Sequence, residues 1–108
     1  MTAALDATLL ALADPTRRRI FEVLLAGATR VAEIADAVGV KGDDLSGHLA
    51  TMEAAGLIVR QGERGEIITA DPAPLQIAAE WINTNRELWT MRSQMQSVSL
   101  EPGPDEAQ

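Results

Sequence analysis

Few side chains in this sequence have the chemistry of a reactive centre. The chain contains one histidine, His48, and no cysteine. A catalytic nucleophile needs a neighbouring base and a group that orients the base. The sequence offers no such set, no glycine-rich phosphate loop and no recognisable pair of catalytic carboxylates. We therefore expect neither enzymatic activity nor a cofactor.

The same residue types limit what metal the chain could hold. Without cysteine there is no thiolate site, no disulfide and no thiol redox sensor. Glu80 and Glu87 lie in the last apolar segment, far along the chain from His48. A site made only of carboxylates favours hard cations and binds transition metals poorly. We expect no dedicated metal site and leave open only a weak carboxylate site.

Basic side chains that could contact phosphate groups are sparse. Arg17–Arg19 is the only basic run, and Arg60 and Arg64 lie near the glycines of a later segment. The formal net charge is −7, which opposes binding to a polyanion. Residues 29–70 contribute −3 and residues 71–108 contribute −4, so the acidity is not confined to the C-terminal end. Any binding to nucleic acid is therefore expected to be weak, strongly salt-sensitive and based on few phosphate contacts.

Hydrophobic periodicity and turn residues indicate five helices and one hairpin. Asp14 is expected to cap the second helix, with Pro15 in its first turn. The expected elements are helices at Leu5–Leu12, 16–25, 30–38 and 43–55, strands at 57–61 and 66–70, and a long helix at 75–98. These elements make one domain at 1–98, and the polar, Pro- and Gly-rich residues 99–108 are expected to form a disordered acidic tail.

Several apolar stripes are expected to form the core. The first helix should turn Leu5, Leu9 and Leu12 to one side. The residues expected inward on the next three helices are Ile20, Phe21, Leu24 and Leu25, then Val31, Ile34, Ala35 and Val38, then Leu45, Leu49 and Met52.

The segment Val31–Leu49 has the pattern of a helix-turn-helix. Two helices that cross steeply admit only a small side chain at the crossing, and Ala35 is placed there. Four residues later Gly39 can adopt the left-handed conformation that reverses the chain. With the hairpin directly after the second helix, the predicted fold is mainly α, a winged helix-turn-helix in the order α-α-α-α-β-β-α. The alternative left open by these residues is an all-α bundle with a hairpin.

Four segments resemble the arsenic-repressor (ArsR) family of winged-helix regulators. They are Leu12–Ile20 (LADPTRRRI), Val31–Ala35 (VAEIA), Leu45–Leu49 (LSGHL) and Glu53–Ile58 (EAAGLI). The similarity extends over about residues 5–95. It implies a homodimer joined through its first and last helices. Such a dimer binds a two-fold operator and usually represses transcription until a signal releases it.

The second helix of a helix-turn-helix presents its N-terminal half to base edges in the major groove. The candidate DNA-binding residues are Arg17, Lys41, Asp44, Ser46, Gly47, His48, Thr51, Arg60 and Arg64. Gly47 stands where the resembled family usually has Arg or Lys, and Asp43 and Asp44 stand where it more often has neutral residues. These aspartates repel phosphates but stabilise a helix N-terminus, and an aspartate can accept from a cytosine amino group. Alternative roles are a histidine hydrogen-bonded inside the fold for His48 and a solvated hairpin residue for Arg60.

Apolar residues recur at helical spacing along the last helix, and this stripe predicts a seam between two copies. The candidate dimer residues are Leu5, Leu9, Ile77, Trp81, Leu88, Trp89, Met91 and Met95. A pocket for a small apolar ligand along the last helix is the alternative.

The sequence therefore predicts a homodimeric DNA-binding regulator, a repressor that reads a palindromic operator and does not sense metals. No apolar run is long enough to cross a membrane, and the N-terminus lacks the basic flank of a secretion signal, so a cytoplasmic location is expected. Two alternatives stay open. One is a winged-helix domain with reduced DNA binding that works through a protein partner. The other is a sensor of a small-molecule effector at the dimer helices.

Overall fold

The computed structural model describes residues 3–99, and side chains as far as residue 96. Two compact units make up the chain, Met1–Ala78 and Ala79–Gln108. The elements are α1 (Ala3–Leu12), α2 (Pro15–Leu24), β1 (Thr29–Arg30), α3 (Val31–Val38), α4 (Gly42–Ala54), β2 (Ile58–Gln61), β3 (Ile67–Ala70) and α5 (Ala73–Ser99). The mainly helical, winged fold class predicted from the sequence is confirmed. The tail expected at 99–108 lies, from residue 100 onward, outside the described residues.

The junction between α1 and α2 is fixed by a side-chain cap. Asp14 Oδ1 accepts hydrogen bonds from the backbone N–H groups of Thr16 at 2.7 Å and Arg17 at 3.2 Å. These N–H groups have no partner within the helix, so the carboxylate satisfies them. Pro15 occupies the first turn of α2, where its missing N–H costs nothing. The cap expected at Asp14 is confirmed.

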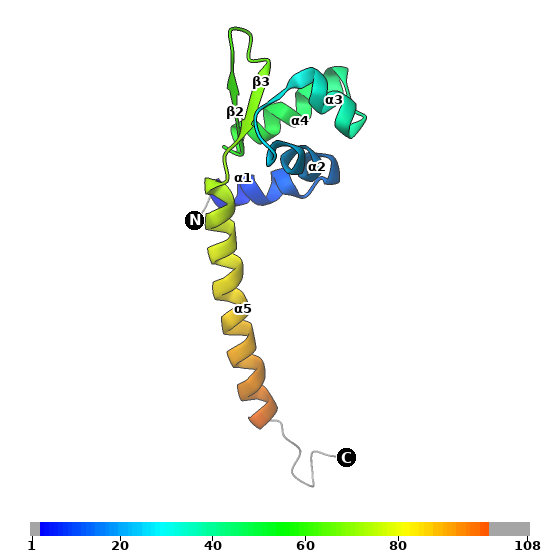
Figure 1. Ribbon diagram of the computed structural model, residues 1–108. Helices are drawn as coiled ribbons and strands as arrows, with labels where there is room; N and C mark the ends of the chain where they lie inside the picture. The colour runs from blue at the N-terminus through cyan, green and yellow to red at the C-terminus, as the bar shows by residue number, and fades with distance from the viewer. Residues whose placement is uncertain (1–2, 100–108) are drawn as a thin grey trace. The chain divides into compact units, whose positions relative to one another are not determined.

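A glycine-bounded turn joins α3 to α4. Gly39 has a φ of 72° and donates its N–H to the carbonyl of Ala35 at 2.9 Å. This left-handed conformation is cheap only for glycine, and it ends α3 as the helix-turn-helix pattern requires. Figure 1 shows α3 and α4 side by side within the first unit, joined by this short connection. The turn reverses the chain, so that α4 lies beside α3 (Figure 1).

The wing is larger than the hairpin expected from the sequence. Strands β2 and β3 pair antiparallel, with Arg60 opposite Ile68, and β1 pairs with the other edge of β3, with Thr29 opposite Ile68. The sheet therefore has the order β1-β3-β2. The N–H of Val31 also donates to the carbonyl of Glu66 at 2.9 Å. The start of α3 is thus tied to the residue that precedes β3.

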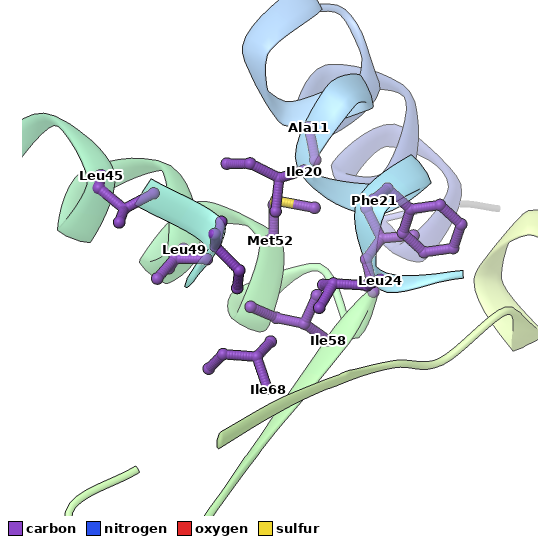
Figure 2. Close-up of a cluster of buried hydrophobic side chains, with 11 residues drawn as sticks. Ala11, Ile20, Phe21, Leu24, Leu45, Leu49, Met52, Ile58 and Ile68 are labelled. Atoms are coloured by element: carbon purple, nitrogen blue, oxygen red, sulfur yellow. The ribbon is translucent and has the colours of Figure 1, made fainter. Parts of the chain in front are cut away.

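One apolar core joins α1, α2, α3, α4 and the sheet. Figure 2 shows side chains from these elements converging, with Met52 of α4 beside Ile20 of α2, and Ile58 and Ile68 of the wing below them. The buried hydrophobic residues of this core are Ala11, Ile20, Phe21, Leu24, Ile34, Leu45, Leu49, Met52, Leu57, Ile58 and Ile68. One side of α4 is therefore fixed against the domain.

None of the described helices combines the length and apolarity of a membrane span.

One inward position expected from the sequence is wrong. Leu25 is 63% exposed, because α2 ends at Leu24 and the following residue turns outward. On α1, Leu9, a predicted dimer residue, is 39% exposed, and Thr8 is buried. Thr8 can be buried because its hydroxyl donates to the carbonyl of Ala4 at 3.0 Å, which satisfies the polar group.

Helix α5 runs for 27 residues and crosses from the first unit into the second. Ala78, in the first unit, is buried. From residue 79 to residue 96 every side chain is exposed except that of Ser93, which is half-buried. The exposed large apolar residues of this helix are Ile77, Trp81, Ile82, Leu88, Trp89, Met91 and Met95. Such a length of exposed apolar helix indicates a surface that needs a partner.

Candidate nucleic-acid interface

Helix α4 has one buried face and one open face. Leu45, Leu49 and Met52 are buried in the core. The exposed residues of the helix are Gly42, Asp43, Asp44, Ser46, Gly47, Ala50, Thr51, Glu53 and Ala54. Because its apolar side is locked in place, α4 presents the polar side as a fixed surface of the size that a major groove admits.

The centre of this open face has no side chain. A Cβ placed on Gly47 would meet no heavy atom within 4 Å apart from the local helix backbone. Thr51 donates its hydroxyl back to the carbonyl of Gly47 at 3.1 Å. The face therefore carries two carboxylates in its first turn, a bare position in its middle, and a threonine hydroxyl bound to its own helix.

Arg17 of α2 links three elements through its guanidinium. Its Nε donates to the carbonyl of Ala11 at 2.6 Å and its Nη2 donates to the carbonyl of Leu10 at 3.1 Å. Its Nη1 lies 3.2 Å from Nδ1 of His48 in α4. The last carbonyls of α1 have no partner within their helix, and a cation there also favours the helix dipole. The structure thus places the predicted DNA contacts Arg17 and His48 side by side, with Arg17 bound to its own chain.

Asp14 belongs to the same group of residues. Desolvation raises the pKa of its carboxyl, but the backbone hydrogen bonds from Arg17 and Thr16 outweigh that effect, together with the positive charge of His48 when its imidazole is protonated and that of Arg17. The net result is a pKa below the usual range for an aspartate. The carboxylate is therefore the stable form at the junction from which Arg17 reaches His48.

The other two arginines of the basic run also bind carbonyl groups. Arg18 Nη1 donates to the carbonyl of Leu12 at 2.8 Å, and Arg19 Nη2 donates to the carbonyl of Ala37 at 3.4 Å. Both side chains are exposed. The basic run thus ties α2 to the C-terminal ends of α1 and α3.

The wing is attached to α4 by a second cross-link. Arg60 Nε of β2 lies 3.1 Å from Oε1 of Glu53 in α4, and Arg60 Nη1 donates to the carbonyl of Gly65 at 3.5 Å. At the wing turn, the N–H of Arg64 donates to a carboxylate oxygen of Glu66 at 2.9 Å, and the residue is exposed. Arg64 is therefore the wing cation at the surface, while Arg60 braces the wing.

Sequence reasoning located the open helix but missed the partners that position its residues. Lys41, Asp44, Ser46, Gly47 and Thr51 are exposed at or on α4. The roles of Asp14 beside His48 and of Glu53 beside Arg60 were not foreseen, and only the Asp-Pro cap signal pointed at one of them.

Among the predicted dimer residues, Leu5 is 5% exposed and packs in its own chain, while the others are at least 39% exposed. Within residues 3–99, no group of three or more acidic or histidine side chains is arranged to hold a metal ion.

The chain matches solved structures of one kind of regulator. A crystal structure of an ArsR family transcriptional regulator shares 27% identity with it at a TM-score of 0.73, covering 81% of this chain and 91% of that one. Residues 12–61 also match the family model described as a helix-turn-helix domain. The chain is an ArsR-like winged helix-turn-helix regulator. The resemblance seen in the sequence is thereby confirmed.

Two further structures resemble this ArsR-like regulator. An ArsR-like transcriptional regulator from Rhodococcus sp. RHA1 has 24% identity and a TM-score of 0.74, with 89% of this chain and 92% of that chain covered. A homodimeric winged helix-turn-helix DNA-binding domain from Mycobacterium bovis, described as a possible ArsR-family regulator, has 23% identity and a TM-score of 0.60, covering 80% and 82%. No curated protein gives a significant match.

Proposed function

We propose that this ArsR-like regulator is a homodimeric repressor that reads a palindromic operator with α4 and the β2–β3 wing. The observation that carries the proposal is the open polar face of α4, which lies opposite the buried Leu45, Leu49 and Met52. A helix held in this way can enter the major groove, and a hairpin beside it can reach an adjacent minor groove. Two copies related by a two-fold axis then require a two-fold operator.

The dimer is supported by the exposed apolar residues of α5. Ile77, Trp81, Leu88, Met91 and Met95 fall on positions separated alternately by four and three residues, with Thr84 completing the series. This is the heptad spacing of a two-helix seam. The M. bovis domain with the same fold is described as homodimeric. A second copy of α5 is the partner that would cover this stripe.

Few cations are available for DNA, so the binding is proposed to be weak and salt-dependent. Arg17 and Arg60 are engaged with their own chain, whereas Lys41 and Arg64 are exposed. Each neutralised phosphate contributes a slope of about −0.9 to a plot of log affinity against log salt concentration. The few contacts proposed here predict a low affinity with a shallow slope, in place of the strong salt sensitivity expected from the sequence.

We also propose that the regulator does not sense transition metals. The sequence has no cysteine, and its single histidine lies on α4 beside Arg17. Titration calorimetry with Zn²⁺ and Ni²⁺ tests this directly. Submicromolar binding of either ion would contradict the proposal.

The decisive experiment is selection of duplex DNA from a random pool at low salt. Recovery of a palindrome, with a fragment shift of the size expected for two chains, supports the repressor. Transcription from a promoter that carries the recovered site should then fall when the protein is present. An increase in transcription would contradict repression but would remain consistent with binding to the palindrome.

A winged-helix domain that works through a protein partner is the second candidate. Asp43 and Asp44 in the first turn of α4 and the bare position at Gly47 favour it, because a duplex would meet two negative charges and no cation there. No enrichment in the selection, together with a purified dimer that is folded and stable, would move the conclusion to this candidate.

A further inference from the structure

We propose that Arg17 is a positioning residue for DNA recognition. It orients His48 so that the neutral imidazole carries its proton on Nε2 and α4 presents a fixed hydrogen-bond donor. The proposal rests on the DNA-binding function proposed above. It assigns to Arg17 an action through His48 in place of a direct phosphate contact.

The identity of the two atoms determines the tautomer. Arg17 Nη1 lies 3.2 Å from His48 Nδ1. A guanidinium has donors only and stays charged in proteins. The nitrogen that meets it must therefore offer a lone pair, which leaves the proton of a neutral imidazole on Nε2.

Contacts that do not involve His48 hold Arg17 in place. Its Nε and Nη2 donate to the carbonyls of Ala11 and Leu10, and its own N–H donates to Asp14. The side chain is half-buried. Moving the guanidinium away would take the side-chain donor from the Ala11 carbonyl and would leave the Leu10 carbonyl with only the N–H of Ala13. The guanidinium that faces His48 is therefore held in a fixed position.

Two charged groups act on His48 from outside α4. Arg17 contacts it from α2, and the Asp14 carboxylate interacts with it from the α1–α2 junction. His48 itself is half-buried on α4, next to the exposed Gly47. One side of the ring is thus committed to the protein, and Nε2–H is the group left for a ligand.

A fixed Nε2–H donor requires an acceptor on the DNA. Purine N7, guanine O6, thymine O4 and phosphate oxygens qualify, whereas the cytosine amino group does not. The shared chemistry is a hydrogen-bond acceptor of duplex DNA. A base acceptor would make Arg17 a determinant of sequence preference, and a phosphate acceptor would make it a determinant of affinity.

The first test is nuclear magnetic resonance of the full chain labelled with ¹⁵N-histidine and lacking any histidine tag. The chain has one histidine, so one pair of ring nitrogens is seen. At a pH where the imidazole is neutral, we expect a protonated Nε2 and an Nδ1 that is shifted by accepting a hydrogen bond. In Arg17→Met both signals should move toward those of a histidine peptide, and in the matched control Arg18→Met they should stay.

Protonation of Nδ1 in the natural protein would overturn the proposal, and so would signals that do not change in Arg17→Met. If Arg17→Met does not fold, Arg17→Lys takes its place. The ammonium keeps the charge but cannot span both carbonyls and His48, so the Nδ1 signal should again move. This arm needs no DNA, so it judges the tautomer even if the proposed function fails.

The second test is a double-mutant cycle on DNA affinity, using the selected operator at low salt. His48→Ala and Arg17→Met should each weaken binding about tenfold, the size of one lost hydrogen bond. The double variant should bind no more weakly than His48→Ala. Independent losses that multiply would show that Arg17 contacts DNA itself and would overturn the proposal.

The profile of the His48→Ala loss identifies the acceptor. Loss of preference at one base pair indicates a base atom, and an equal loss on all sequences indicates a phosphate. Tight binding by His48→Ala equal to that of the natural protein would contradict any use of the Nε2–H donor. Absence of DNA binding by the natural protein would refute the proposed function and leave the tautomer result standing.

Discussion

Glu53 in the last turn of α4 and Arg60 in β2 form an ion pair, with 3.1 Å between Glu53 Oε1 and Arg60 Nε. The two side chains are 47% and 29% exposed. A pair this accessible contributes little to stability. Its consequence is geometric, because it couples the helix proposed to read the major groove to the wing.

Replacing Glu53 by Gln should release Arg60 toward DNA. The slope of log affinity against log salt should steepen by about one phosphate contact, and low-salt affinity should rise. The free energy of unfolding should change by no more than about 1 kcal/mol, because the pair is exposed. Salt titrations by fluorescence anisotropy measure the slope.

Glu63→Gln is the matched control, because Glu63 lies in the exposed wing turn and the substitution removes the same charge. It should leave the slope unchanged. An equal steepening in both variants would mean that net charge alone, and not the release of Arg60, governs the effect.

Gly47 can accept a basic side chain. The position is exposed, and an added Cβ meets nothing within 4 Å. Gly47→Arg should strengthen binding to DNA about tenfold at low salt and steepen the salt dependence, because it puts a cation in the centre of the α4 face. Gel-shift titration measures the gain.

Gly47→Ala separates charge from helix propensity. It should raise the free energy of unfolding by about 1 kcal/mol, since alanine is the better helix former, with DNA affinity unchanged. A comparable gain in affinity from alanine would show that α4 order, and not the missing cation, limits binding.

The sequence was sufficient where a local conformation or a repeating pattern determined the structure. Gly39 had to take the left-handed turn, Asp14 had to cap α2, and the apolar spacing of α4 fixed which face is buried. The same logic failed at Leu25, because two adjacent residues at a helix end fit the period equally well. Strand β1 was missed because two residues are too short to show an alternation.

The contacts that position the site depend on tertiary structure. Arg17 meets His48 across 31 residues of sequence, and nothing local to either residue encodes the encounter. Thr8 was overlooked because its buried hydroxyl is satisfied by its own helix, so a polar residue occupied a core position. A single sequence gives the chemistry of such side chains but not which of them meet.

Asp14 makes the stability of the domain depend on acid pH. Its pKa is lowered in the folded state, so its contribution is fully present above the ordinary aspartate pKa of about 4 and is lost as pH falls through the lower folded value. Asp14→Ala should therefore be less stable than the natural protein at neutral pH, with the difference shrinking in acid. Urea midpoints followed by circular dichroism at a series of pH values measure this.

Asp36→Asn provides the comparison for Asp14. Asp36 is exposed in the middle of α3 and caps no helix. Its substitution should leave the pH profile of the urea midpoint parallel to that of the natural protein. If the urea midpoint of Asp14→Ala were lower than that of the natural protein by the same amount at every pH, the carboxylate charge would not be what stabilises the junction.

Leu88 lies at the middle of the α5 stripe and is 56% exposed in a single chain. If two copies of α5 pack along the heptad positions, Leu88→Asp puts a charge into the seam, where its desolvation is not compensated. The variant should elute and sediment as a monomer at concentrations where the natural protein is a dimer. It should also lose affinity for a two-half-site operator while keeping most of its affinity for a single half-site.

Asn83→Asp adds the same charge at an exposed position off the stripe and should remain dimeric. A monomeric natural protein, or dimers that persist in Leu88→Asp, would place the contact between copies on another surface, and α1, with its exposed Leu9 and Leu10, would be the next to test.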